Sequence, residues 1–293
     1  MNYLPNRLAR NLRVRQTRTV GVIIPDIENP FYTSVIGGIE EVLQASEHTL
    51  LLANSAENAN REQANARTFQ SEGVAGIIFA ASGSDYSIYR DLLSTAMPLV
   101  AISRVPDSLR IDAVSVANQA GVRTAVSHLL GLGHRRIAII SGPPWISTAK
   151  ERMQGYEESL AAAGIALDRD LVQFADFRQH GGYQAMSELL KLPGRPTAVF
   201  VGSNLMTLGA LQAIHERNMQ IPQQIAVVGF DDMPWAVSLN PPLTAVAQPA
   251  YKVGVTAARL LLERLQNPAK PPRHLVLETS LVVRSSCGSA ISK

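Results

Sequence analysis

Short apolar runs rich in β-branched residues alternate with longer segments of helical periodicity along almost the whole chain. The first run, residues 19–25, reads TVGVIIP and predicts a buried strand, and residues 31–46 continue as a helix behind Pro30. The same reading predicts strands at 49–54, 74–80, 98–103, 113–116, 136–141, 171–175, 197–201 and 225–229, and helices at 61–71, 85–94, 119–130, 148–162, 182–190 and 206–216. This alternation indicates an α/β protein with parallel sheets.

The predicted elements fall into two consecutive sets, which indicates two doubly wound, Rossmann-like lobes joined by a hinge. A length of 293 residues fits two domains. The tail, with strands expected at 243–248 and 274–283 around a helix at 251–265, has too few elements for a third domain and should complete the first two. We therefore expect one lobe from 19–116 plus 249–274 and the other from 117–248 plus 275–287, preceded by residues 1–18 and followed by a tail at 288–293.

Composition excludes several classes of protein. Hydrophobic residues make up 46% of the chain and charged residues 17%, which is typical of a folded globular protein. No apolar run approaches the roughly 18 residues that span a bilayer, and no secretory signal follows the basic start. The one cysteine, Cys287, excludes an internal disulfide and is expected in a polar tail. These features predict a cytoplasmic protein without a membrane partner.

Positive charge is concentrated at the start of the chain. Residues 1–18 contain five arginines and no acidic residue, whereas the rest of the chain has 22 basic and 24 acidic residues. Residues 6–13 predict a short basic helix with Leu8 and Leu12 on one face. Its arginines could neutralise phosphates and its leucines could wedge into a DNA groove. The alternative is a solvated, frayed tail, because so short a helix is marginal in water.

The motifs of enzymes are missing from the sequence. There is no phosphate-binding loop, nucleophile elbow or zinc-binding helix. The six histidines are scattered without the spacing of metal ligands. We expect no catalytic residue, no metal and no cofactor.

Polar and aromatic residues gather at strand ends, where doubly wound folds bind ligands. Asn29, Phe31 and Tyr32 follow the first strand, and an amide beside aromatic faces suits a sugar, which stacks on rings and needs donors and acceptors. The alternative is that Asn29 only caps a helix and Phe31 belongs to the core.

Further candidates follow later strands: Arg104, Arg152, Phe177, Ser203, Asn204, Asp231 and Gln248. A guanidinium offers five fixed donors for hydroxyl or carboxylate groups. Either arginine alone could equally be a surface ion-pair partner. The shared placement at strand ends favours a binding site.

The chain resembles the lactose-repressor (LacI/GalR) family of bacterial transcription regulators from Asn2 to about Arg284. The segments that carry the resemblance are 2–10 (NYLPNRLAR), 17–26 (TRTVGVIIPD), 29–31 (NPF), 132–138 (LGHRRIA), 152–156 (RMQGY), 227–232 (VVGFDD) and 241–244 (PPLT). Together these segments are specific to the family.

The resemblance implies a two-lobed core like type I periplasmic binding proteins, which forms a homodimer or tetramer and binds a small sugar-like effector between its lobes. It implies that residues 1–18 are a linker and hinge helix whose Asn6, Arg7, Ala9, Arg10 and Leu12 contact operator DNA. Family members carry a helix-turn-helix before this segment, and we expect it to be absent from this chain. Ser103 and Ser203-Asn204 replace the family's usual Asp and Asn-Asp, which leaves the identity of the sugar open.

The resemblance therefore predicts a regulator, most simply a repressor, of a carbohydrate-utilisation operon. A transport system's periplasmic-type sugar-binding protein is the alternative, since it would share the fold. A sugar-modifying enzyme on the same fold is a third reading and would require turnover.

Overall fold

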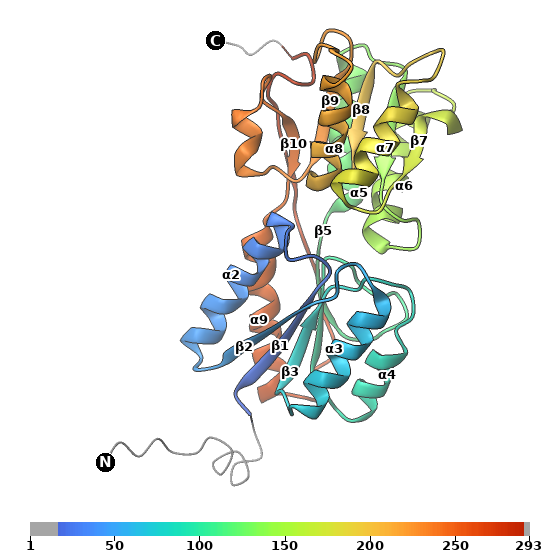
Figure 1. The fold of residues 1–293 in the computed structure, drawn as a ribbon. Helices are drawn as coiled ribbons and strands as arrows, with labels where there is room; N and C mark the ends of the chain where they lie inside the picture. Colours follow the sequence, from blue (N-terminus) through green and yellow to red (C-terminus); the bar gives the residue numbers. More distant parts are fainter. Residues whose placement is uncertain (1–16, 290–293) are drawn as a thin grey trace. The chain divides into compact units, whose positions relative to one another are not determined.

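The structure is a computed structural model that describes residues 17–289, and the chain divides into two compact units. Unit 1 comprises the described part of Met1–Ser115 together with Ala250–Leu275, and unit 2 comprises Val116–Pro249 together with the described part of Val276–Lys293. The chain passes between the units three times. Each unit contains a six-stranded, mostly parallel sheet with helices on both faces, so the predicted α/β, doubly wound fold class is confirmed (Figure 1).

Unit 1 is built on a sheet with the order β11-β5-β4-β3-β1-β2. Its strands are β1 (Thr19–Ile24), β2 (Thr49–Asn54), β3 (Gly76–Phe79), β4 (Leu99–Ile102), β5 (Asp112–Val116) and β11 (His274–Leu277). β1 pairs in parallel with both β2 and β3, so the chain winds outward in both directions from β1. The point between β1 and β3 is where such sheets place their ligands.

Two pairs of helices cover the faces of this sheet. α2 (Pro30–Ala45) packs against α9 (Ala250–Gln266), and α3 (Ala59–Ser71) lies with α4 (Ser87–Ser94) on the other face (Figure 1). The α2–α9 contact depends on glycine, because a Cβ on Gly254 would lie 1.9 Å from the Val35 carbonyl oxygen. The C-terminal helix α9 thus completes the first unit.

Unit 2 repeats the same winding with the order β12-β10-β9-β8-β6-β7. Its strands are β6 (Ile137–Ser141), β7 (Val172–Phe174), β8 (Ala198–Val201), β9 (Ala226–Phe230), β10 (Thr244–Ala247) and β12 (Ser280–Val282). Its helices are α5 (Asn118–Gly131), α6 (Ser147–Ala162), α7 (Gln179–Leu189) and α8 (Asn204–His215), with the 3-10 turns η1 (Arg169–Leu171) and η2 (Pro234–Ser238).

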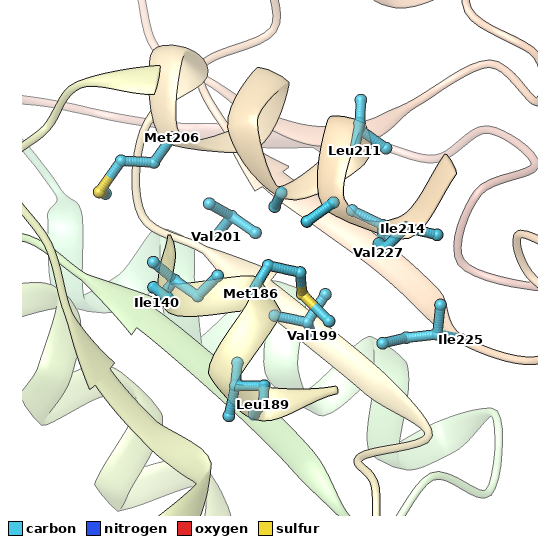
Figure 2. Close-up of a cluster of buried hydrophobic side chains, with 14 of the residues drawn as sticks. Ile140, Met186, Leu189, Val199, Val201, Met206, Leu211, Ile214, Ile225 and Val227 are labelled. Atoms are coloured by element: carbon cyan, nitrogen blue, oxygen red, sulfur yellow. The ribbon is translucent and has the colours of Figure 1, made fainter. Parts of the chain in front are cut away.

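The core of unit 2 has two layers because successive side chains of a strand point to opposite faces. Val199 and Val201 of β8 join the layer under α7 and α8, whereas Ala198 and Phe200 join the layer under α5 and α6. Figure 2 shows the first layer, where Met186 of α7 and Ile214 of α8 pack over the strand residues. Burial on both faces explains why the strands read as continuous apolar runs in the sequence.

Two expectations about the C-terminal part of the chain are wrong. The predicted strand at 274–283 is two short strands, because β11 belongs to the sheet of unit 1 and β12 pairs antiparallel with β10 in unit 2. Cys287 is not in a polar tail but is fully buried in the core of unit 2. Its sulfur accepts a hydrogen bond from the Thr244 hydroxyl at 3.2 Å and lies 3.3 Å from His128 Nε2.

Between residues 17 and 289 no helix is both long enough and apolar enough to cross a bilayer.

Candidate functional site

The residues predicted after β1 form the start of helix α2 in unit 1. Asn29 is the N-cap of α2, and its Oδ1 accepts a hydrogen bond from the Phe31 N–H at 3.0 Å. The rings of Phe31 and Tyr32 are buried, with centroids 5.0 Å apart in an edge-to-face arrangement. The capping and core roles that the sequence left open are therefore both present, and they fix the amide and the two rings at the carboxyl end of β1.

Arg104 follows β4 and is held by a carboxylate that the sequence did not identify. Its Nη1 and Nη2 donate to the two oxygens of Glu57 at 2.6 and 2.7 Å, and Nη1 also donates to the Ala81 carbonyl at 3.1 Å. Burial lowers the pKa of Arg104, but the neighbouring Tyr32, Glu57 and Glu62 raise that pKa above its ordinary value. The guanidinium is therefore permanently charged and paired within unit 1.

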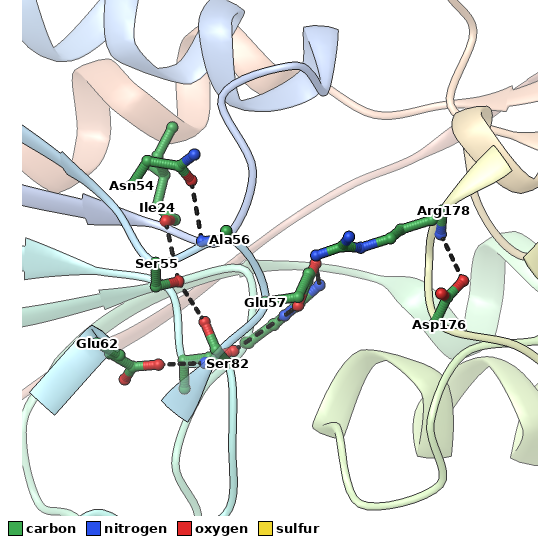
Figure 3. A network of polar contacts seen from close by, with 11 residues as sticks. Ile24, Asn54, Ser55, Ala56, Glu57, Glu62, Ser82, Asp176 and Arg178 are labelled. Atoms are coloured by element: carbon green, nitrogen blue, oxygen red, sulfur yellow. Dashed lines mark hydrogen bonds and ion pairs between the residues drawn. The ribbon is translucent and has the colours of Figure 1, made fainter. Parts of the chain in front are cut away.

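A second buried carboxylate, Glu62 of α3, supports the segment behind β3 (Figure 3). Glu62 accepts hydrogen bonds from the Tyr89 hydroxyl at 2.7 Å and from the Ser82 N–H, and the Ser82 and Ser55 hydroxyls lie 2.6 Å apart. Burial raises the pKa of Glu62, against the lowering effect of these hydrogen bonds. The network ties the ends of β2 and β3 together, and so fixes the Ala81 carbonyl that Arg104 uses.

In unit 2, Arg152 projects from α6 towards the ends of β8 and β9. Its Nε donates to Asn118 Oδ1 at 2.9 Å and its Nη1 to the Gly202 carbonyl at 2.5 Å. Its guanidinium carbon lies 3.6 Å from the ring centroid of Phe230, the last residue of β9. A cation over an aromatic face is attracted to it, so the ring holds the guanidinium flat.

Asp231, directly after β9, forms hydrogen bonds with two other predicted residues, Asn204 and Gln248. One of its oxygens accepts a hydrogen bond from the Asn204 N–H at 3.1 Å, and the other accepts one from Gln248 Nε2. Burial raises the pKa of Asp231, while Arg152, Gln248 and Asn204 act in the opposite direction. Gln248 Oε1 is buried and accepts no hydrogen bond from the described residues, so an acceptor is available beside the carboxylate.

The other two predicted residues of unit 2 have local structural roles. Ser203 is the N-cap of α8, with its hydroxyl 3.4 Å from the Met206 N–H. Phe177 has a left-handed backbone, with φ of 64°, and its ring packs so closely on Gly142 that a Cβ there would lie 2.0 Å away. Phe177 also belongs to the apolar core layer of this unit.

Sequence reasoning missed Glu57, Glu62, Asn118 and Phe230. Asn118 begins α5 after a strand and Phe230 precedes Asp231, so position at a strand end could have identified both. Glu57 also follows a strand, β2, but no local pattern links it to Arg104, which lies 47 residues further along the chain. The predicted DNA contacts Asn6, Arg7, Ala9, Arg10 and Leu12 lie outside the described residues.

A groove with a volume of about 1020 Å³ lies in unit 1 at the amino-terminal ends of the strands, opposite the carboxyl ends where the candidate residues lie. It is lined by the residues that precede the strands, including 17–18, 45–48, 73–75 and 95–98, and by the end of α9. Ligands of doubly wound folds bind at the carboxyl ends of the strands, so this groove is distinct from the candidate site. From Thr17 to Ser289, no three His, Cys, Asp or Glu side chains gather as a metal site would require.

Comparison with known proteins identifies the family. A family described as Periplasmic binding protein-like domain matches residues 126–287. The ribose operon repressor of Haemophilus influenzae is 35% identical over 286 residues, which cover 98% of this chain and 86% of that protein. The HTH-type transcriptional repressor CytR of Escherichia coli is 30% identical over 286 residues, with 98% and 84% of the two chains covered.

A solved LacI family transcriptional regulator from Enterococcus faecium, with bound ribose, is also similar. It superimposes with a TM-score of 0.81 at 29% identity, covering 92% of this chain and 98% of that one. The family match spans more than half of the chain, and the repressors align along nearly all of it. The chain therefore belongs to the LacI/GalR family of transcription regulators, which are not enzymes.

Proposed function

We propose that this chain is a sugar-responsive transcription repressor whose effector is a small sugar of the ribose type. Its relatives are named ribose operon repressors, and a similar solved regulator carries bound ribose. The observation that carries the proposal is the pair of Asp231 and Gln248. The buried Gln248 Oε1 lies beside the Asp231 carboxylate and accepts no hydrogen bond from the described residues. Each of these oxygens can accept a hydrogen bond from a hydroxyl group of a sugar.

The carboxyl edge of each unit supplies groups of the kind that a sugar requires. Asn29, Phe31, Tyr32 and Arg104 are the candidates in unit 1, and Arg152, Phe177, Ser203, Asn204, Asp231 and Gln248 are those in unit 2. Charged side chains held by buried partners keep their geometry without ligand, which reduces the entropy lost on binding.

Effector binding would control the affinity of the protein for operator DNA. An effector shifts DNA binding only as far as it prefers one conformation of the protein over another, with a typical coupling of ~1–3 kcal/mol. The arginines of residues 6–13 are the basic groups that we assign to DNA phosphates. We further propose that the protein acts as a homodimer in the cytoplasm.

Thermal unfolding of the full chain in the presence of candidate effectors tests this function. A ligand at about 100 times its dissociation constant adds about 2.7 kcal/mol to the free energy of unfolding. We expect ribose or a related pentose to raise the unfolding midpoint, while hexoses, nucleobases and polyols raise it less. Asp231→Asn should reduce the shift, whereas Asp170→Asn, at an exposed position of the same unit, should retain it in full. The proposal would be contradicted if no sugar raised the unfolding midpoint of either the wild type or Asp170→Asn.

A further inference from the structure

The Glu57–Arg104 ion pair lies across the carboxyl edge of the unit 1 sheet. Glu57 follows β2 and Arg104 follows β4, and β1 and β3 lie between these two strands in the sheet. The Arg104 side chain therefore extends past the ends of the two central strands. It also donates a hydrogen bond to the carbonyl of Ala81, which follows β3. The pair thus occupies the position where a doubly wound sheet binds its ligand.

The pair is bidentate and well shielded from water. Both guanidinium Nη atoms meet a separate carboxylate oxygen, at 2.6 and 2.7 Å. The side chains are 6% exposed for Arg104 and 15% exposed for Glu57. The planar fork of arginine matches a carboxylate in this geometry, which gives a strong and directional interaction. Glu57 therefore takes the two donors with which Arg104 would otherwise hold an anionic ligand.

The backbone before α3 holds Glu57 in this position. Ala56 and Glu57 both have left-handed conformations, with φ of 51° and 57°, which are uncommon outside glycine. The Glu57 N–H donates to the Pro25 carbonyl at 2.8 Å, and the Ala56 N–H donates to Asn54 Oδ1 at 3.2 Å. Residues held in such conformations by their surroundings concentrate at ligand sites.

The candidate arginine of unit 2, Arg152, also has a carboxylate nearby. Asp231 lies close enough to Arg152 for the positive charge to act on the pKa of that carboxyl. Each of these two arginines therefore has a carboxylate nearby. A site for phosphates or sugar acids requires a cation without a compensating carboxylate. Neither Arg104 nor Arg152 is such a cation.

We infer that Glu57 is a specificity-determining residue, whose carboxylate on Arg104 makes the site accept an uncharged effector and reject one that carries phosphate or carboxylate. A hydroxyl group can donate to a Glu57 oxygen and accept from Arg104, whereas a phosphate only accepts and is repelled by the carboxylate. This inference rests on the proposed function, because it names the class of effector bound at the same site.

The test compares wild type and Glu57→Gln, as full chains, with inorganic phosphate, ribose and ribose 5-phosphate. In wild type we expect ribose to raise the unfolding midpoint and both phosphates to leave it unchanged. In Glu57→Gln we expect both phosphates to raise the midpoint, and the dissociation constant of ribose 5-phosphate relative to that of ribose to fall at least about tenfold. The double variant Glu57→Gln/Arg104→Gln should lose this gain.

Two further variants serve as controls. Glu57→Asp keeps the charge and should keep the rejection of phosphate, and Glu72→Gln removes an exposed carboxylate at the end of α3 and should behave as wild type. Cooperative unfolding and circular dichroism establish that Glu57→Gln is folded. If Glu57→Gln does not fold, Glu57→Ser, which removes the same carboxylate, takes its place in the test.

The outcomes separate the two proposals. Phosphate binding by wild type, or a folded carboxylate-free variant that gains no phosphate, would overturn the inference even if ribose binds. If no uncharged sugar binds wild type but removal of the carboxylate creates phosphate binding, the role of Glu57 stands and the proposed effector is wrong.

Discussion

The two units share one strand order but neutralise their arginines in different ways. In unit 1 the Glu57 carboxylate, from another loop, accepts two hydrogen bonds from the Arg104 guanidinium. In unit 2 the Arg152 guanidinium rests on neutral acceptors and an aromatic ring, and its counter-charge, Asp231, is hydrogen-bonded to Gln248 and Asn204. The same fold can thus hold a buried cation by a direct ion pair or by a ring with a separated carboxylate, and the second arrangement leaves polar groups available to a ligand.

The largest effect should come from breaking the direct pair in unit 1. Arg104→Met leaves Glu57 without its counter-charge and should lower the free energy of unfolding by roughly 3 kcal/mol, as for other buried pairs that lose one partner. Arg152→Met should cost less, about 1–3 kcal/mol, because the Asn118 and Gly202 oxygens to which Arg152 donates are neutral. Denaturant unfolding of both variants measures the difference.

A double variant sharpens this prediction. Glu57→Met together with Arg104→Met removes both charges, and it should recover most of the stability lost in Arg104→Met, because well-packed apolar residues can replace a buried ion pair. Equal losses in the single and double variants would show that packing, rather than charge pairing, governs this position.

The next largest effect concerns effector affinity in unit 2. Asp231→Ala and Arg152→Ala should each weaken binding of the effector about tenfold or more, since each leaves a polar group of the ligand unpaired at a cost of roughly 1–3 kcal/mol. Titration calorimetry with the sugar found by thermal unfolding measures this. Near-wild-type affinity in both variants would mean that the effector binds elsewhere.

A smaller effect tests the aromatic support of Arg152. Phe230→Leu removes the ring beneath the guanidinium, whereas Phe200→Leu removes an equally buried ring 6.4 Å away that contacts no cation among the described interactions. Both lose similar packing, so the additional loss in Phe230→Leu should be about 0.5–2 kcal/mol, the typical range for a cation over a ring. Equal losses would assign no energetic role to the cation.

The smallest effect is a pH dependence in unit 1. Because burial raises the pKa of Glu62 above 4.5, its contribution to stability is full below that value and is lost as the pH rises through the raised pKa. Glu62→Gln should therefore gain stability relative to wild type as the pH rises from 4.5. Glu158→Gln should show the opposite trend, because side-chain hydrogen bonds from Gln119 and Gln154 lower the pKa of Glu158. Denaturant unfolding at a series of pH values checks both slopes.

Local patterns in the sequence predicted the elements but not the contacts between distant ones. The apolar runs at 19–25 and 197–201 mark β1 and β8 because strands buried on both faces exclude polar residues. The same rule failed at 274–283, where the chain leaves one sheet and enters another within a few residues. The Glu57–Arg104 pair could not be predicted, because it depends on two left-handed residues without glycine and on strands that meet only in the folded sheet.

The three passages of the chain between its units have a consequence for how such genes recombine. Each unit is encoded in two separate stretches, with junctions at Ser115/Val116, Pro249/Ala250 and Leu275/Val276. A single crossover between residues 117 and 249 of two related genes therefore joins α9 from one parent to strands β1 to β5 from the other. Intact exchange of either unit needs a crossover at each of the three junctions, so α9 and the first hundred residues should be inherited together wherever their packing has diverged.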